Sequence, residues 1–488
     1  MDASEPRGWR RRLGRAGSRR DGVRRPAAKR RGPSEGARGA AACPKKGAVT
    51  DLLAARWLFG LSLAFHIVFA AIGVAMPLLM VLAEWRWRRT GVPAYLELAK
   101  RWAKGTAILF AVGAVSGTVI SFELGLLWPR FMELAGPIIG MPFSLEGFAF
   151  FAEAIFLGIY LYGWGKVSAA AHLASGAVVA ASGAASAFFV TLANAWMNVP
   201  AGFALEAGRP VDVRPFVAMF PPGWGHEVVH VLLSCYVATG FAVAGIHALA
   251  LRRDPANAFH RGALRIALGV GAVAALLQPA SGDFSARHVA ATQPVKLAAL
   301  EGQFETERGA PLRLGGVPDE EARETRYALE LPRALSLLAF HDPDAEVKGL
   351  SAFPRDTWPN VRNVHLAFQV MVALGSALAA ASAVHLFLRL RRREPPRWFL
   401  GAIVLLAPAG FVALEAGWLV TEWGRQPFTI RDVMRTSEAV TPVGNLLLPL
   451  VAFGLLYVFL TVVVVVLLGR QIAHAPTAAE AARVEARP

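Results

Sequence analysis

Long apolar stretches separated by short polar segments dominate the sequence from residue 51 onwards. A helix needs about 20 predominantly apolar residues to cross a bilayer, and about nine stretches meet this requirement. We predict transmembrane helices at about 52–84, 105–128, 143–165, 169–195, 224–251, 262–280, 360–388, 398–420 and 443–468. The predicted fold class is therefore all-α, a polytopic membrane protein with about nine transmembrane helices in a bundle.

Three regions lie outside this series of helices. Residues 281–359 are neither apolar enough to span a bilayer nor biased enough to be disordered, so we expect one long external loop there. Residues 1–50 contain few apolar side chains and are expected to be a basic, disordered extension. Residues 51–470 would then form the transmembrane unit, and residues 471–488 a cytoplasmic tail.

The distribution of charge predicts the orientation of the chain. Lys and Arg are more frequent in the loops after the first, third, fifth and seventh helices than in the short loops after the even-numbered helices. By the positive-inside rule the Lys- and Arg-rich loops are cytoplasmic, so the chain starts outside and ends in the cytoplasm.

Residues 1–50 contain 15 of the Lys and Arg residues and 4 of the Asp and Glu residues, a large part of the net charge of +16. The basic composition is therefore local, and it does not indicate nucleic-acid binding. A basic segment on the outer side opposes both the membrane potential and the positive-inside rule. We therefore expect the working protein to start near Val49.

Glu415 is the most unusual residue of the eighth predicted helix. It follows the apolar run 398–412 and lies a few residues inside the end of the span. An unpaired charge there costs several kcal/mol, so the carboxylate should be paired, protonated or bound to a cation. Arg425 and Gln426 follow in a Gly-Arg-Gln-Pro turn that suits an anionic partner. This combination favours a redox-cofactor site over a structural helix cap.

Other ionisable residues inside the predicted helices are also candidates for function. His66 lies in the middle of the first helix among apolar residues, where a neutral histidine bonded to a carbonyl is the alternative. Glu146 and Glu153 are seven residues apart, which places them on one face of the third helix. Two carboxylates on an apolar helix indicate proton relay or charge compensation, and an interhelical hydrogen bond is the simpler alternative.

The sequence from His226 to His230 matches the HExxH pattern of zinc proteases. His226 follows a Pro-Gly pair at the start of a helix, and no later intramembrane Asp supplies an evident third ligand, which weakens this interpretation. His230 and Met371 instead lie at comparable depth, and imidazole with thioether is a ligand pair for low-spin haem iron. His365 competes with Met371 as a ligand, and Met371 alternatively fills the core.

In the predicted external loop, Lys296 and Glu301 are candidates for binding a polar headgroup at the membrane surface. Several longer stretches then resemble, in the same order, subunit I of the cytochrome bd quinol oxidases. These stretches are 116–128, 145–153, 296–301 and 415–427. The resemblance covers the chain from residue 51 to the end of the ninth helix. It implies a respiratory quinol:oxygen oxidoreductase that reduces oxygen to water.

The resemblance implies three haems in this subunit: a low-spin haem b, a high-spin haem b, and haem d or a further haem b. His66 and Glu415 would be axial ligands of the two high-spin haems. The resemblance does not say which residue binds which of these haems. His230 and Met371 would bind the low-spin haem, which first receives electrons. Arg425 and Gln426 lie in the signature turn of the family.

The resemblance also implies roles for the remaining candidates. Glu146 and Glu153 match an acidic pair linked to proton delivery, and Lys296 and Glu301 match residues of the quinol loop. Quinol oxidation near the outer face and proton uptake from the inside would generate a proton motive force without pumping. The implied partners are a second integral subunit, in some cases a small single-helix subunit, quinol and oxygen. The implied location is the bacterial cytoplasmic membrane.

Three features depart from the usual family pattern. Phe428 ends the signature turn where Trp is usual, and Gln369 stands where many relatives have Arg. The external loop is short, as in the cyanide-insensitive branch of the family, in which haem b can replace haem d. The alternatives from other classes are an intramembrane zinc protease and a haem b electron-transfer subunit that does not reduce oxygen. A transporter is a further alternative, but we find no repeat symmetry.

Overall fold

The structure is a computed structural model that describes residues 46–441 and 444–473. Within these residues, nine segments are long and apolar enough to cross a membrane, as predicted. They are α1 (Lys46–Thr90), α2 (Pro93–Leu127), α3 (Pro129–Tyr162), α4 (Ala169–Asn198), α6 (Trp224–Arg253), α7 (Ala258–Thr292), α10 (Val361–Leu390), the pair α11 (Arg397–Leu406) and α12 (Ala409–Gly424), and α14 (Leu447–Ala473). The predictions for residues 1–45 and for the tail beyond residue 473 fall outside the described residues.

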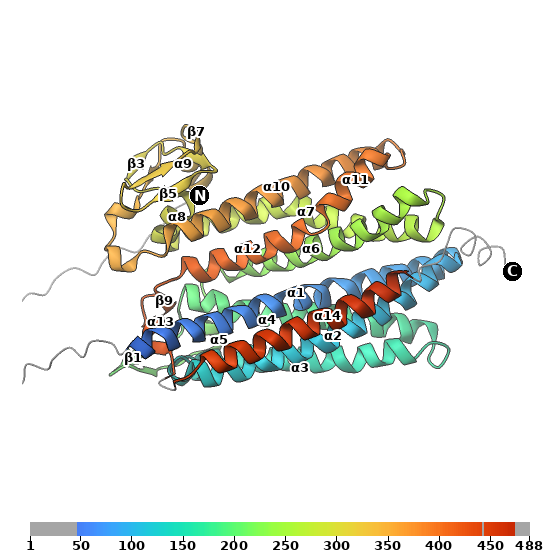
Figure 1. Cartoon of the computed structure of the whole chain (residues 1–488), viewed down its shortest axis with the longest axis horizontal. Helices are drawn as coiled ribbons and strands as arrows, with labels where there is room; N and C mark the ends of the chain where they lie inside the picture. Colours follow the sequence, from blue (N-terminus) through green and yellow to red (C-terminus); the bar gives the residue numbers. More distant parts are fainter. Residues whose placement is uncertain (1–45, 442–443, 474–488) are drawn as a thin grey trace, which may run out of the picture. The chain divides into compact units, whose positions relative to one another are not determined.

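Shorter elements gather at one end of the long helices (Figure 1). The short helices are α5 (Pro215–Met219), α8 (Pro294–Glu301), α9 (Ala334–Phe340), α13 (Thr436–Ala439), η1 (Leu350–Ala352) and η2 (Arg355–Thr357). The strands are β1 (Ala204–Glu206), β2 (Arg209–Val211), β3 (Glu307–Arg308), β4 (Leu312–Leu314), β5 (Val317–Asp319), β6 (Glu324–Arg326), β7 (Leu329–Leu331), β8 (Glu346–Val347), β9 (Phe428–Ile430) and β10 (Met434–Arg435). They form five antiparallel pairs: β1–β2, β3–β8, β4–β7, β5–β6 and β9–β10.

Several helices extend beyond the apolar stretches that predicted them. Helix α7 continues to Thr292, so residues 281–292, which we predicted as part of the external loop, are helical. Helices α2 and α3 begin at Pro93 and Pro129, well before the predicted starts. Proline suits the first turn of a helix because that position makes no N–H bond within the helix. Hydropathy therefore locates the part of a helix inside the bilayer and not the helix ends.

The eighth span is broken, whereas the sequence predicted one continuous helix. Helix α11 ends at Leu406 and α12 starts at Ala409, with Pro408 between them. Proline has no backbone N–H, and its ring clashes with the carbonyl four residues earlier. Glu415 therefore lies in the middle of a separate 16-residue helix.

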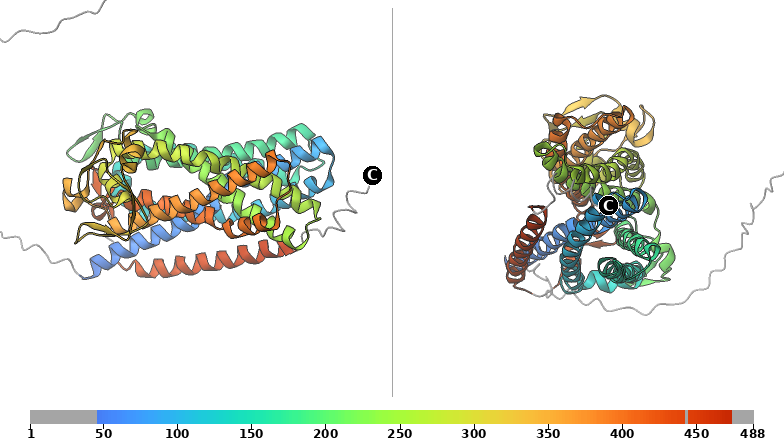
Figure 2. Two further views of the ribbon diagram at one scale, coloured as in Figure 1. Left: turned by 90° about the horizontal axis from the view of Figure 1, so that it is seen from above. Right: turned by 90° about the vertical axis from the view of Figure 1, so that its right-hand side faces the viewer.

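The long helices pack mainly as sequential neighbours: α1 with α2, α3 with α4, and α6 with α7. Glycine permits a close contact between α6 and α7. A Cβ atom on Gly240 of α6 would lie 2.7 Å from the Cα atom of Gly271 on α7. Helix α14 lies at the edge of the bundle (Figure 2) and packs against α1 and α2.

Candidate functional site

His66 is held in one tautomer by a serine of the neighbouring helix. Its Nδ1 atom lies 3.0 Å from the Oγ atom of Ser116 on α2. The hydroxyl of Ser116 donates its hydrogen to the carbonyl of Val112, so it accepts a hydrogen bond from the imidazole. The hydrogen is therefore on Nδ1 and the lone pair is on Nε2. Metal-binding histidines in proteins are commonly held in this way.

His230 on α6 repeats the same arrangement. Its Nδ1 atom lies 2.9 Å from the Oγ atom of Ser281 on α7, and that hydroxyl donates to the carbonyl of Gln278. Ser281 therefore also accepts from the imidazole, and the Nε2 atom of His230 is left to bind a metal.

His365 and Met371 competed as partners of His230 in the sequence analysis. Both ring nitrogens of His365 contact backbone carbonyls, at 2.7 Å from Leu300 and 3.0 Å from Gly315. Neither nitrogen is left for iron, and the geometry therefore favours Met371. A Cβ atom on Gly417 of α12 would lie 3.2 Å from the Sδ atom of Met371. The absence of a side chain at Gly417 makes room for the thioether.

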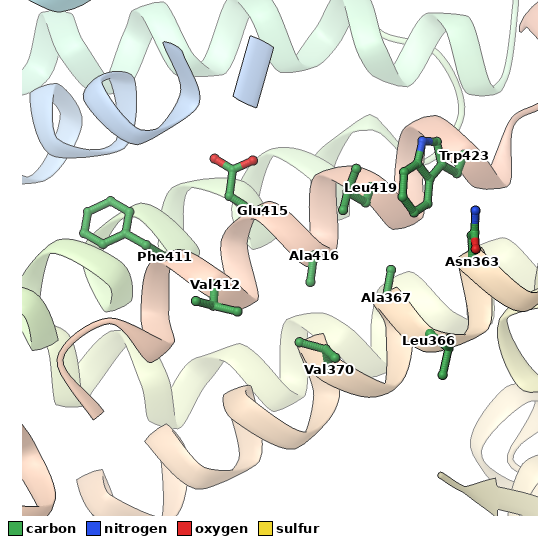
Figure 3. Close-up of a pocket in the computed structure, with 10 residues that line it drawn as sticks. All are labelled: Asn363, Leu366, Ala367, Val370, Phe411, Val412, Glu415, Ala416, Leu419 and Trp423. Carbon is green, nitrogen blue, oxygen red and sulfur yellow. The ribbon is translucent and has the colours of Figure 1, made fainter. Parts of the chain in front are cut away.

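Glu415 has a buried carboxylate oxygen, Oε1, without a hydrogen-bond partner. Figure 3 shows its carboxylate pointing away from α10, whereas Val412 and Ala416 point toward that helix. Between α10 and α12 lies an apolar groove of about 510 Å³. The groove is lined by Asn363, Leu366, Ala367, Val370, Phe411, Val412, Glu415, Ala416, Leu419 and Trp423. A buried carboxylate oxygen without a partner fits a role as a metal ligand.

Glu146 and Glu153 lie on the side of α3 that faces α4. Glu146 accepts a hydrogen bond of 3.0 Å from Ser186. Glu153 is buried, and a Cβ atom on Gly183 would lie 3.4 Å from each of its carboxylate oxygens. Seven helical residues span about 10 Å, so the two acids lie at different depths. Glu153 lies deeper, farther from the end of the bundle that carries α8.

A buried polar cluster connects α8 with the signature turn. The Nζ atom of Lys296 lies 3.3 Å from the Oδ1 atom of Asn198. Asn194 and Arg425 each donate a hydrogen bond of 2.6 Å to Glu422. Arg425 is buried, yet its Nε and Nη1 atoms have no partner. Two free guanidinium donors in a buried position fit an anionic group.

Contacts around the signature turn show why it contains a glycine and a glutamine. A Cβ atom on Gly424 would lie 2.8 Å from the side chain of Lys296, so glycine lets the lysine pass. Gln426 accepts a hydrogen bond of 2.9 Å from Thr436, and this bond orients its amide within the turn. Lys296, Arg425 and Gln426 line a second cavity of about 260 Å³.

Lys296 and Glu301 are both buried, but they lie on different sides of α8. Five residues of an α-helix correspond to a rotation of about 140° between their side chains. Burial lowers the pKa of Lys296 to about 8, although the carboxylate of Glu227 opposes this shift. Burial raises the pKa of Glu301 to about 8, with Arg313 opposing. Both groups therefore change charge near the same pH, in a part of the molecule outside the membrane spans.

The HExxH match is not arranged as a zinc site. The Nδ1 atom of His226 contacts Ser285 at 3.0 Å, and its ring lies beside His288. In the described part of the chain, no three His, Cys, Asp or Glu side chains gather where they would hold a metal ion together. The zinc protease alternative therefore has no support.

The sequence matches the cytochrome bd terminal oxidase subunit I family over residues 54–476. The chain belongs to this family. Among curated proteins, it is 38% identical to a putative cytochrome bd menaquinol oxidase subunit I of Bacillus subtilis, over 86% of this chain and 94% of that protein. It is 27% identical to the cytochrome bd-II ubiquinol oxidase subunit 1 of Escherichia coli, over 88% and 97%.

A solved structure of a bd oxidase shows that the fold, too, is that of the family. The bd oxidase of Geobacillus thermodenitrificans matches with a TM-score of 0.83 and 41% identity, over 88% of this chain and all of that chain. Cytochrome bd subunit I belongs to a quinol oxidase that serves as a respiratory terminal oxidase, and the protein described here is such a subunit.

The family implies haem, and the side chains of this cytochrome bd subunit fit haem binding. His66 and His230 each present an Nε2 lone pair, while a serine holds the other ring nitrogen. Glu415 supplies an unpartnered carboxylate oxygen. Arg425 supplies two free donors, which suit the propionate groups of a haem.

Several residues of this site were not found by sequence reasoning. They are the three serines that hold His66, Glu146 and His230, and the cluster residues Asn194 and Asn198. Serine is common on transmembrane helices, and only the pairing across helices distinguishes these three. Glu422 and Glu227 already stood in motifs visible in the sequence, the stretch from Glu415 to the Gly-Arg-Gln-Pro turn and the HExxH match.

Proposed function

We propose that this subunit carries both half-reactions of the oxidase, quinol oxidation near the end with α8 and reduction of oxygen to water within the bundle. The observation that supports this most directly is the repeated serine-held histidine, at His66 and at His230. One site would suffice for an electron-transfer subunit. Two such histidines and the unpartnered carboxylate oxygen of Glu415 would provide ligands for more than one haem.

His230 and Met371 would hold the low-spin haem b, and His66 and Glu415 would hold the high-spin haem b and haem d, or a further haem b in place of haem d. When bound, these groups accept electrons one at a time and reduce oxygen at an open coordination position. Imidazole and carboxylate differ as ligands, so the two high-spin centres should differ in potential. Arg425 would position a propionate group.

Quinol would bind beside α8, where Lys296 and Glu301 are buried. Glu301 would take a proton from the quinol. The ammonium group of Lys296 would donate a hydrogen bond to the quinol. The apolar groove between α10 and α12 ends at Asn363 and Trp423, close to α8, and suits an isoprenoid tail. Relatives are named as menaquinol and ubiquinol oxidases, and the apolar lining suits either tail.

Protons for oxygen reduction would come from the opposite end of the bundle. Glu153 lies nearer that end and Glu146 lies about 10 Å closer to the end with α8. The serine bonded to Glu146 holds the carboxylate in place. With quinol protons released outside and these protons taken up inside, turnover separates charge across the membrane without a pump.

The subunit would work in the bacterial cytoplasmic membrane with a second integral subunit and, in some complexes, a small single-helix subunit. The distribution of the Lys- and Arg-rich loops supports an orientation with the α8 end outside. The N-terminus would then lie outside and the C-terminus in the cytoplasm.

Optical spectra of the purified, dithionite-reduced complex test this proposal. We expect a low-spin haem b spectrum together with a carbon monoxide-sensitive high-spin component. Met371→Leu should convert the low-spin haem to a high-spin form, whereas His66→Ala should remove the high-spin haem that His66 holds and spare the low-spin one. His365→Ala serves as the control and should retain the low-spin spectrum. A low-spin spectrum that survives in Met371→Leu but is lost in His365→Ala would contradict the assignment.

A further inference from the structure

A buried chain of hydrogen bonds connects three helices near His66. The hydroxyl of Tyr457 on α14 donates to the Oγ atom of Ser62 on α1, at 2.8 Å. The hydroxyl of Ser62 donates in turn to the Oε1 atom of Glu123 on α2, also at 2.8 Å. The exposed fractions of Tyr457, Ser62 and Glu123 are 3%, 0% and 4%. None of the roles described above uses these three residues.

The hydrogen-bond pattern indicates which form of Glu123 is present. The second carboxylate oxygen, Oε2, is buried and has no partner. No Lys or Arg in the described part of the chain forms an ion pair with Glu123, and Ser62 is its only hydrogen-bond donor. A buried carboxylate without a cation is costly, whereas the neutral acid avoids the cost of burying a charge. Glu123 therefore carries a proton, and its O–H group at Oε2 is free.

Glu123 and His66 lie along the same contact between α1 and α2. Ser62 precedes His66 by four residues, which is about 6 Å along the helix and on the same face. Glu123 follows Ser116, the residue that holds His66, by seven residues, again on one face. The ring of Phe65, next to His66, stacks on the ring of Tyr457 at 4.4 Å. The three residues thus lie just beyond His66, on its α8 side.

We propose that Glu123 is a further proton-holding residue for oxygen reduction at the site around His66, with Ser62 and Tyr457 as its positioning residues. This inference rests on the proposed function. The O–H bond at Oε2 breaks, the proton goes to the oxygen being reduced, and the electrons come from quinol through the enzyme's own reaction. The hydroxyl of Ser62, already directed at Oε1, stabilises the resulting carboxylate until it is protonated again.

A purely structural role, in which the three residues only attach α14 to the bundle, is the competing explanation. Glu123→Gln separates the two explanations, because glutamine retains an oxygen to accept from Ser62 but has no acidic proton. Infrared difference spectra, recorded when light releases carbon monoxide from the reduced complex, detect protonated carboxyl groups near the haems. We expect a carboxyl band in the wild type that is absent in Glu123→Gln and shifted in Tyr457→Phe.

Ser121→Ala is the matched control, since Ser121 lies on the same helix and its hydroxyl bonds only to the backbone. Its infrared spectrum should equal that of the wild type. We also expect Glu123→Gln to slow proton uptake on mixing with oxygen by on the order of 100-fold, with haem content and midpoint temperature unchanged.

Identical infrared spectra for the wild type and Glu123→Gln would overturn the proposal. If Glu123→Gln loses haem, Tyr457→Phe decides: a shifted band supports the proposal, and an unshifted band overturns it. A wild-type complex without any haem spectrum would contradict the proposed function and leave no site for Glu123 to serve.

Discussion

At the scale of single residues, Ser116 and Ser281 orient His66 and His230 through hydroxyl groups that also bond to their own helices. The sequence singled out the two histidines and Glu415, because ionisable residues in an apolar helix are costly. It did not single out the two serines, because a serine that bonds only its own helix and a serine that also holds an imidazole look alike in sequence. Whether a histidine is free to bind a metal or is bonded at both ring nitrogens depends on such contacts across helices.

Removal of either serine should affect only the haem of its own histidine. Without the hydroxyl, the imidazole loses the partner that fixes its tautomer, and partners of this kind commonly change metal affinity about 10- to 100-fold. Ser116→Ala should weaken or shift the high-spin centre, and Ser281→Ala the low-spin haem. Redox titration of the optical spectrum measures both centres at once. Each variant is the control for the other, and a shift of both haems in one variant would contradict the assignment.

The two buried groups of α8 predict opposite pH effects on quinol oxidation. As pH rises through about 8, Glu301 loses its proton and becomes able to act as a base, so the rate of haem reduction by quinol should rise and then level off. Over the same range Lys296 loses its charge, so the KM for quinol should rise.

Stopped-flow reduction at a series of pH values separates these two effects. Glu301→Gln should remove the rise in rate and keep the change in KM. Lys296→Gln should do the reverse. If both variants kept the complete wild-type pH profile, neither residue would act on quinol.

At the scale of elements, hydropathy predicted all nine spans, but it did not predict where helices end or break. The apolar content of α7 ends near residue 280, whereas its helix continues to Thr292 because backbone hydrogen bonds do not require apolar side chains. The break before α12 was visible as Pro408, but proline also occurs inside α1, α3 and α7 without interrupting them. Only the packing of the neighbouring helices distinguishes these cases.

The contact of α1 with α4 should be sensitive to side-chain size at Gly183. A Cβ atom there would lie 3.1 Å from the carbonyl of Gly73 and 3.4 Å from the carboxylate of Glu153. Gly183→Val should therefore separate the helices or displace Glu153, at a cost of about 1–3 kcal/mol. We expect a lower midpoint temperature and slower oxygen consumption. Gly147→Val, where the Cβ atom meets no neighbour within 4 Å, is the control and should remain close to the wild type in both measurements.

At the scale of the whole molecule, the candidate acids lie at different depths. Glu301 lies on α8 at one end, whereas Glu153 lies deeper on α3. In the proposed function, this order would separate the site where quinol releases protons from the site where protons enter. The sequence predicted the alternating direction of the helices, but neither the relative depths of these acids nor the contacts that surround them.

Proteoliposomes containing a pH indicator inside test this separation. With the end that carries α8 facing outward, quinol oxidation should make the interior alkaline and the exterior acidic. Glu153→Gln should slow the alkalinisation of the interior and leave a single reduction of the low-spin haem by quinol unchanged. An interior pH that does not change in the wild type would contradict proton uptake from that side.

The position of α14 has a consequence for how the subunit matures. This helix follows the other eight spans in the chain, and it covers the contact between α1 and α2, through Tyr457 on Ser62 and through Val464 beside Phe69. Until α14 is inserted, the side of α1 that carries Phe65 and Phe69 faces lipid or the insertion machinery. The surroundings of His66 are thus complete only after insertion of the ninth span, and we expect a prosthetic group to reach His66 from this side more easily before that step than after it.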